Sequence, residues 1–302
     1  MLDAKIKKTG VCIPNTFVTN DDLSKVMDTN HDWIYQRTGI AKRAIAKDES
    51  LLDLTKKAVI DLNLSEEELQ SVDAIIVATM SFELKSPGLS PLIQNEFNFK
   101  DDIMCFDINV ACSGYVYAFD IARTYIKSGI YKNVLVIGAD KMSNIIDPLD
   151  RSTAILFADG VSCSLLTADE KEHVLFRYMN TTGNKEPLQC VDKLEMKGQD
   201  VFRFAVGING NCLDMVDKEI GIENVDYFLF HQANVRIIDN LIKKYKLDES
   251  KVIKNIENLG NTSSASVGIL LNDIKENIKE GDVVMMTGFG SGLTYGCLVY
   301  KH

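Results

Sequence analysis

Three residues far apart in the sequence carry side chains that could work together in catalysis. Cys112 lies in the segment DINVACSGYVYAF, where one apolar run ends in small residues and a second begins. His231 follows the apolar run YFLF, and Asn261 lies in NLGNTSSASVG. A thiol, an imidazole and a carboxamide can supply a nucleophile, a proton donor or acceptor, and a hydrogen-bond donor.

Cys112 is predicted to stand at the N-terminus of a helix. The helix dipole there favours the thiolate and lowers the pKa of the thiol, and the neighbouring small residues expose backbone N–H groups to a substrate carbonyl. Equally, Cys112 could be a small core residue at a tight contact between helix and strand. The other cysteines (12, 105, 163, 190, 212 and 297) occur singly and without a C-x-x-C pair. They indicate buried hydrophobic residues rather than disulfides or a zinc site.

His231 is the one histidine of four that leaves an apolar strand-like run. This position suits acid–base or hydrogen-bond chemistry, although a core histidine with satisfied hydrogen bonds fits too. No second histidine or paired cysteine accompanies it, so a metal role is weakly supported. Near Asn261, Thr262, Ser263 and Ser264 are expected to cap the next helix, which leaves the Asn261 amide free to point elsewhere.

A glycine-rich segment, GFGSGLTYG at 288–296, stands between two predicted strands. It lacks the lysine of a phosphate-binding loop and opens no helix. The segment therefore predicts a loop of backbone N–H donors or a plain hairpin.

The elements that must position these residues alternate between strand and helix. Helices are predicted at 21–27, 51–62 and 113–127, the last ended by Gly129, and a capping box at Ser65 and Glu68 begins another. Apolar strands are predicted at 74–79, 104–108 and 134–138. This alternation predicts an α/β fold with parallel layers.

The second half of the chain repeats the pattern of the first. VDAIIVATMS at 72 has a counterpart in VDYFLFHQAN at 225, an offset of 153 residues, and the strand at 134 has one at 283, an offset of 149. Such agreement suggests an internal duplication, although short apolar strands also match by chance. Two paired halves would bring the carboxyl ends of their strands together, where ligands collect in α/β sheets.

Composition limits the class of protein. The chain has 302 residues, 46% of them hydrophobic, which is enough for two packed core units. A net charge of −10 argues against a general nucleic-acid binder. With no run of about 18 apolar residues and no signal-like N-terminus, we expect a soluble cytoplasmic protein without membrane association.

Taken together, these segments resemble β-ketoacyl-acyl carrier protein synthase III, a family of condensing enzymes with the thiolase fold. The resemblance covers nearly the whole chain in family order: TNDDLSKVMDTNHDWIYQRTGI, DINVACSGYVYAFDIA, DPLDRSTAILFADG, KGQDVFRFAV, FHQANVRI, NLGNTSSASV and GFGSGLTYG. It implies a layered αβαβα core made of two duplicated α/β halves. The N-terminal half, residues 1–167, would carry Cys112, and the C-terminal half, residues 168–302, would carry His231 and Asn261.

The resemblance also implies a mechanism and its partners. Cys112 takes an acyl group from acyl-CoA. His231 and Asn261 then stabilise the enolate formed when malonyl-acyl carrier protein loses CO₂, and the enolate attacks the acyl-Cys112 thioester. Backbone N–H groups of Cys112 and Ser291 would hold the oxyanion. No metal or redox cofactor is required, and a homodimer is implied.

Binding residues follow from the same resemblance. Trp33 and Arg151 match the pair that holds the CoA adenine, and Arg37 matches a residue near the CoA phosphates. Gln232 and Arg236 match the region that faces acyl carrier protein, with Lys243, Lys244 and Lys246 extending a basic face. Without the resemblance, those lysines would be read as a solvated helix face.

The chain departs from the family pattern at two informative positions. Ser291 replaces the middle one of three glycines, and its Cβ could crowd the pocket. Ser86 stands where short-chain members have a bulky aromatic residue, often supplied by the partner subunit, and this predicts a primer longer than acetyl or a paralogue with a specialised role. Two other functions remain open: an acyltransferase that passes the acyl group to an oxygen or nitrogen nucleophile, and a non-catalytic partner subunit.

Overall fold

Two mixed β-sheets form the frame of the protein. The structure is a computed structural model, and it describes residues 2–302. The first sheet has the strand order β1 (Asp3–Cys12), β7 (Asp159–Asp169), β6 (Asn133–Lys141), β4 (Ala74–Ala78) and β5 (Met104–Ile108). The second has the order β11 (Tyr227–Phe230), β12 (Val283–Gly290), β13 (Gly292–Lys301) and β8 (Val174–Asn184).

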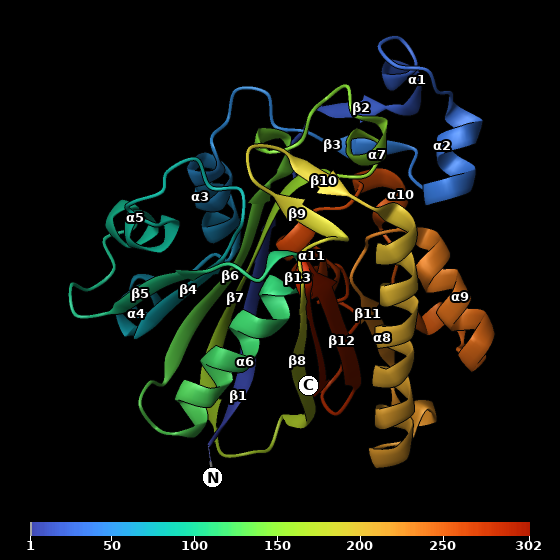
Figure 1. The fold of residues 1–302 in the computed structure, drawn as a ribbon. Coiled ribbons are helices and arrows are strands. Elements are labelled where there is room, and N and C mark those ends of the chain that lie inside the picture. The colour runs from blue at the N-terminus through green and yellow to red at the C-terminus, as the bar shows by residue number, and fades with distance from the viewer. Residues whose placement is uncertain (1) are drawn as a thin grey trace.

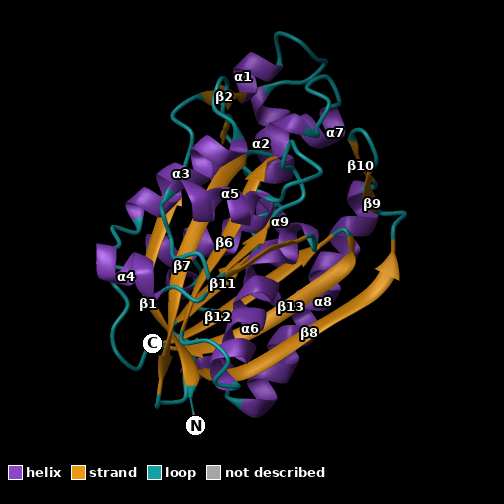
Figure 2. Ribbon diagram, turned by 90° about the vertical axis from the view of Figure 1, so that its left-hand side faces the viewer, coloured by secondary structure: helices purple, strands orange, loops and turns teal. Residues whose placement is uncertain are grey.

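Helices complete a five-layered arrangement around the sheets. Between the sheets lie α6 (Gly114–Lys127) and α11 (Ser266–Asp273), whose apolar side chains share one core cluster with strands of both sheets. The helices α3 (Leu51–Asp61) and α5 (Leu89–Glu96) cover the outer face of the first sheet. The outer face of the second is covered by α8 (Gly198–Glu219) and α9 (Val235–Tyr245), as Figures 1 and 2 show.

The two sheets share one topology over four strands. In the first, β4 is parallel to β6, β6 antiparallel to β7, and β7 antiparallel to β1. In the second, β11 is parallel to β12, β12 antiparallel to β13, and β13 antiparallel to β8. This repeat of order and direction supports the predicted duplication, with β5 as an extra edge strand. The boundary at 167/168 stays a prediction, since β7 continues to Asp169 and β8 begins at Val174.

Short elements gather at the carboxyl ends of the parallel strands, in the upper part of Figure 1. Among them, the β9–β10 hairpin lies over the second half of the molecule. These elements are β2 (Phe17–Thr19), α1 (Asn20–Leu23), α2 (His31–Thr38), β3 (Lys42–Ala44), α7 (Arg151–Ala154), β9 (Leu188–Cys190), β10 (Leu194–Met196) and α10 (Ile256–Leu259). The remaining helix, α4 (Glu66–Ser71), begins at the predicted capping box of Ser65 and Glu68.

Most predicted elements are present with small changes in length. The predicted strand at 104–108 is β5, and the helices predicted at 51–62 and 113–127 are α3 and α6. The helix predicted at 21–27 is shorter, because α1 ends at Leu23 and turns continue to Met27. No helix within residues 2–302 combines the length and apolar character needed to cross a membrane.

Candidate active site

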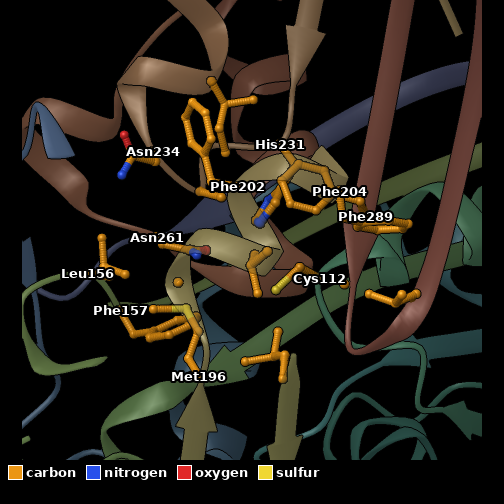
Figure 3. A pocket seen from close by; sticks show the side chains of 17 residues that line it. Cys112, Leu156, Phe157, Met196, Phe202, Phe204, His231, Asn234, Asn261 and Phe289 are labelled. Atoms are coloured by element: carbon orange, nitrogen blue, oxygen red, sulfur yellow. The ribbon is translucent and has the colours of Figure 1, made fainter. Parts of the chain in front are cut away.

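Cys112, His231 and Asn261 line one cavity of about 100 Å³. Figure 3 shows their side chains converging on the same space from separate elements. The rest of the wall is mostly apolar: Leu156, Phe157, Leu188, Met196, Val201, Phe202, Phe204, Ile237, Phe289 and Leu293. The three residues that the sequence analysis expected to work together therefore line one cavity, although they are far apart in the sequence.

Cys112 sits in a sharp turn at the entrance to α6. The turn is a single 3-10 turn, Ala111–Ser113, and Ala111 has a φ of +49°, a left-handed conformation that non-glycine residues rarely adopt. Cys112 is only 5% exposed, and its Sγ lies 3.4 Å from Oγ of Ser263. The strained turn thus fixes the thiol in the cavity wall.

Burial raises the pKa of the Cys112 thiol to about 12. The hydrogen bond with Ser263 acts in the opposite direction, and the charge of Asp140 adds to the increase. The prediction of a lowered pKa is therefore wrong for the free protein. An apolar, water-poor cavity destabilises the thiolate more than the short approach to α6 stabilises it.

His231 is held on both sides by hydrogen bonds. Its backbone N–H donates to the carbonyl of Thr287 at 2.9 Å, and its Nδ1 lies 2.6 Å from Oγ of Ser266. The ring also contacts Phe289 edge to face, with 5.1 Å between centroids. Desolvation lowers the pKa of His231 to about 3, so the imidazole is neutral at physiological pH.

Asn261 is fixed by a short parallel bridge to Phe157. Its N–H donates to Leu156 at 2.9 Å, and its carbonyl accepts from Ala158 at 2.8 Å. The side-chain Oδ1 accepts from the N–H of Ser263 at 2.9 Å, which directs the Nδ2 donor away from that bond. Asn261 follows the short helix α10.

The predicted cap formed by Thr262, Ser263 and Ser264 is absent. Neither the 3-10 turn at Ser263–Ala265 nor α11 has a side-chain cap hydrogen bond. Ser263 contacts Cys112 instead, and the hydroxyl of Ser264 donates to the carbonyl of Ala78 at 3.0 Å. These serines therefore connect the turn to the cavity and to the first sheet.

The glycine-rich segment is the predicted hairpin, formed by β12 and β13. It approaches Cys112 so closely that a Cβ at Gly290 would lie 2.7 Å from the Cys112 backbone nitrogen. Ser291 does not line the cavity, because its hydroxyl donates to the carbonyl of Leu188 at 2.6 Å. Its side chain does not produce the crowding that the sequence suggested.

A wider hollow of about 730 Å³ opens beside the cavity. Both are lined by Leu156, Met196, Gly198, Phe202 and Asn234, so the hollow leads inward. Trp33 and Arg37 lie in its wall. The guanidinium carbons of Arg37 and Arg151 lie 4.2 and 4.7 Å from the Trp33 ring centroid, so cations already stack on the indole.

The residues predicted to face acyl carrier protein divide into two groups. Gln232 is 0% exposed, and its side chain binds backbone groups of Phe230, Asn255 and Ile256. A direct contact of Gln232 with a partner protein is therefore wrong, because the amide is used to hold neighbouring loops. Arg236 is exposed and lines the hollow with its guanidinium over Phe202.

Ser86 lies outside the cavity wall of its own chain and is exposed. Its predicted effect on the acyl pocket would therefore act on a partner subunit. Within residues 2–302, no group of three or more His, Cys, Asp or Glu side chains is arranged to hold a metal ion.

Several contributors to the site were not predicted. Ser266 contacts His231, Asp140 accepts from the N–H of Ser264 at 3.0 Å, and the β9–β10 hairpin supplies Leu188 and Met196 to the wall. The run NTSSAS shows that hydroxyls are present there, but their directions depend on the turn. Ser263, for example, has a φ of +50°.

A layered αβαβα fold whose two halves share a topology, with a cysteine at the start of the buried helix α6, is that of a thiolase-like condensing enzyme. Solved structures agree with this class. The 3-oxoacyl-[acyl-carrier-protein] synthase III of Aquifex aeolicus VF5 is 38% identical with a TM-score of 0.92, over 99% of this chain and 100% of that one. The enzyme of Thermus thermophilus is 33% identical with a TM-score of 0.93, over 98% of each chain.

Sequence comparisons identify the family within this class of enzymes. Residues 106–183 match the family 3-oxoacyl-[acyl-carrier-protein (ACP)] synthase III, and residues 215–302 match its C-terminal domain. The β-ketoacyl-[acyl-carrier-protein] synthase III of Aquifex aeolicus is 41% identical over the full length of both chains. That of Streptococcus mutans is 39% identical, also over both full lengths. The chain belongs to the β-ketoacyl-acyl carrier protein synthase III family.

Proposed function

We propose that the protein joins an acyl group from acyl-CoA to malonyl-acyl carrier protein by decarboxylative Claisen condensation, in fatty acid or related biosynthesis. The observation that carries the proposal is the single cavity shared by Cys112, His231 and Asn261. A nucleophile and two neutral hydrogen-bond donors in a largely apolar space suit a reaction whose transition states carry negative charge on oxygen.

In the first step, the sulfur of Cys112 attacks the thioester carbon of acyl-CoA. The C–S bond to CoA breaks, and CoA leaves as a thiol with the proton that Cys112 has lost. Backbone N–H groups of Cys112 and Ser291 stabilise the tetrahedral oxyanion, and each such donor is worth roughly 3 kcal/mol of barrier. The close approach of Gly290 to the Cys112 backbone supports this proposal, because it brings the segment that contains Ser291 near Cys112.

In the second step, malonyl-acyl carrier protein occupies the cavity. His231 and Asn261 donate hydrogen bonds to its thioester carbonyl. When CO₂ leaves, the electron pair of the broken C–C bond stays as an enolate, which these donors stabilise. The enolate carbon then attacks the acyl thioester, and Cys112 leaves as thiolate and takes up a proton. A neutral His231 still carries one ring N–H and can therefore donate this hydrogen bond.

The hollow outside the cavity suits the CoA moiety. CoA is long, and a hollow continuous with the cavity can hold its nucleotide while its thioester reaches Cys112. Trp33 and Arg151 would hold the adenine, and Arg37 would pair with phosphate. Arg236, with Lys243, Lys244 and Lys246, gives an exposed basic face for the acidic carrier protein.

We further propose a cytoplasmic homodimer that needs no metal or redox cofactor. Seven free cysteines suit a reducing compartment. Within residues 2–302, the edge strand β5 pairs with β4 alone, and its other side could pair with a second copy. In such a dimer, the exposed Ser86 loop of one copy could shape the acyl pocket of the other, and a small serine there predicts primers longer than acetyl.

The test separates loading from condensation. Purified protein receives radiolabelled acyl-CoAs of graded length, followed by malonyl-acyl carrier protein. We expect label on Cys112, then CO₂ and a β-ketoacyl product. Label without CO₂ would support an acyltransferase, and absence of label with every acyl-CoA would support a non-catalytic subunit.

Substitutions then assign the roles. Cys112→Ala should abolish loading, whereas His231→Ala and Asn261→Ala should leave loading measurable and abolish decarboxylation. Survival of both steps in either of the last two variants would contradict the assigned roles.

A further inference from the structure

A neutral imidazole carries one proton, and the nitrogen that holds it decides what His231 can do. With the proton on Nε2, the ring donates a hydrogen bond into the cavity. With the proton on Nδ1, the ring offers only a lone pair there. His231 is 2% exposed, so water does not randomise the choice.

The hydrogen bonds around Ser266 indicate which nitrogen of His231 carries the proton. Ser266 is the first residue of α11 and is 2% exposed. Its Oγ lies 2.6 Å from Nδ1 of His231, and it accepts from the backbone N–H of Gln232 at 3.4 Å. A backbone N–H can only donate, so this contact uses an acceptor site of the hydroxyl and leaves its hydrogen for another partner.

Nδ1 of His231 is the acceptor that the geometry offers to this hydrogen. Among residues 2–302, the Ser266 hydroxyl forms no hydrogen bond other than those with His231 and Gln232. If Nδ1 carried the proton instead, two N–H groups would point at one oxygen and the hydroxyl hydrogen would be buried without a partner. Buried polar groups rarely remain unpaired, because desolvation is then not compensated.

We propose that Ser266 is a positioning residue that donates to Nδ1 of His231 and thereby fixes the tautomer with Nε2–H directed into the cavity. Ser266 does not line the cavity, and it acts through His231. The significance for catalysis rests on the proposed function, in which Nε2–H is one of two donors to the malonyl thioester carbonyl. The tautomer itself does not depend on that function.

The same turn sets the second donor. The backbone N–H of Ser263 binds Oδ1 of Asn261 and so presents the Nδ2 donor, while Ser266, three residues later, presents the Nε2 donor. Figure 3 shows the imidazole and the amide directed into the same space. One turn, 263–266, therefore orients both donors toward a common acceptor.

The first experiment measures the tautomer without measuring activity. Protein labelled with ¹⁵N-histidine is studied by NMR between pH 6 and 8, and the His231→Gln variant identifies the His231 signals. We expect a protonated Nε2 and an unprotonated Nδ1 in the wild type. A protonated Nδ1, or a mixture of the two tautomers, would overturn the inference.

The second experiment removes the hydroxyl. In Ser266→Ala, we expect the tautomers to mix and decarboxylation of malonyl-acyl carrier protein to slow by about 10- to 100-fold, less than the roughly 100- to 1,000-fold loss for removal of a donor itself. Loading of Cys112 should change by less than about twofold, because that step uses backbone donors. Ser266→Thr keeps a hydroxyl and should restore both the tautomer and the rate.

Ser162→Ala is the matched control. Ser162 is buried in β7 and packs on Gly268 of α11, the helix that begins at Ser266. Its hydroxyl has no hydrogen-bond partner within the described residues, so its removal should leave decarboxylation unchanged. Equal losses in Ser162→Ala and Ser266→Ala, or an unchanged tautomer in Ser266→Ala, would refute the role of Ser266. If the wild type releases no CO₂, the proposed function fails, and the NMR result still decides the tautomer.

Discussion

At the scale of single residues, one apolar cavity shifts two pKa values in opposite directions. Burial raises the pKa of Cys112 to about 12 and lowers that of His231 to about 3. Both shifts favour the uncharged form, as desolvation must. The free protein therefore holds a neutral thiol beside a neutral imidazole, rather than a thiolate–imidazolium pair. This state keeps the imidazole proton available for a hydrogen bond to substrate.

The buried imidazole should make the protein sensitive to acid. The unfolded chain binds a proton at His231 near pH 6.5, but the folded protein does so only near pH 3. The contribution of the neutral His231 to the free energy of unfolding is therefore complete above about pH 6.5. It is lost as the pH falls toward 3, and the loss is roughly 2–3 kcal/mol at pH 4.5. Urea unfolding at pH 7.5 and 4.5 measures this loss, which should be smaller in His231→Gln.

Asn261→Ala is the control for that measurement. It alters the same cavity without removing a titratable group, so it should retain the wild-type loss between the two pH values. If His231→Gln and the wild type lose the same free energy of unfolding, protonation of His231 is not a cause of the acid sensitivity.

Trp33 offers a direct signal for nucleotide binding. It is the single tryptophan of the chain, and two guanidinium groups stack on it. An adenine that stacks on the indole must move Arg151, which also donates to the carbonyl of Asp28 at 2.7 Å. We expect CoA to change the intrinsic fluorescence and Arg151→Ala to weaken CoA binding by about 3- to 30-fold.

Removal of one positive charge outside the hollow distinguishes stacking on Trp33 from general electrostatic attraction of CoA. Lys218 is exposed in the last turn of α8 and does not line the hollow, so Lys218→Ala should bind CoA as the wild type does at the same salt concentration. A Trp33 fluorescence signal that does not change when CoA is added would contradict a role for Trp33 and Arg151. Equal CoA affinities of the wild type, Arg151→Ala and Lys218→Ala would contradict it as well.

At the scale of elements, two equivalent 3-10 turns build the site. Ala111–Ser113 precedes α6 and Ser263–Ala265 precedes α11, and each begins with a residue at a φ near +50°. The turns contact one another through Cys112 and Ser263. The duplication thus places the proposed nucleophile on one turn and hydrogen-bond supports of the two proposed donors on or just after the other.

The sequence predicted the elements better than the contacts between them. Apolar runs and capping residues are local signals, so β5, α3 and α6 could be predicted with few errors. The hydroxyl of Ser291 could not be placed, because its partner, the carbonyl of Leu188, is 103 residues away. The raised pKa of Cys112 escaped prediction for a similar reason, since it depends on burial in a cavity whose wall includes side chains far away in the sequence, such as Phe204 and Phe289.

The close approach of β12 to the Cys112 turn should tolerate no side chain at position 290. In Gly290→Ala, the new Cβ would lie 2.7 Å from the Cys112 nitrogen, so the loop must move and displace an oxyanion donor. We expect loading of Cys112 to fall by about 100-fold or more. The rate of single-turnover loading with one acyl-CoA measures it.

Gly207→Ala provides the comparison. Gly207 lies inside α8, and a Cβ there meets no atom within 4 Å. This variant should load normally and gain about 1 kcal/mol of stability from the better helix propensity of alanine. Normal loading by Gly290→Ala would show that the loop can move without harm to the oxyanion donors.

At the scale of the whole molecule, the edge strand β5 is the feature that one chain leaves incomplete. It pairs with β4 on one side only, and all its residues are half-buried, whereas those of β4 are buried. Its sequence MCFDI lacks lysine and proline, which commonly protect exposed edges. The carboxylate of Asp107 accepts from the N–H groups of Leu89 and Ser90, so it is turned toward α5.

In the proposed dimer, twofold symmetry would pair β5 with β5 and extend one sheet through both molecules. We expect sedimentation at twice the mass of one chain and protection of β5 amides from hydrogen exchange that increases with protein concentration.

The loop before α5 reaches Asp107 through Gly88 and carries Leu84, which is 51% exposed. Leu84→Lys should therefore weaken the dimer, whereas Val26→Lys, at a residue 58% exposed on another surface, should not. A wild type that sediments as one chain while fully active, or equal behaviour of the two lysine variants, would contradict a dimer through β5.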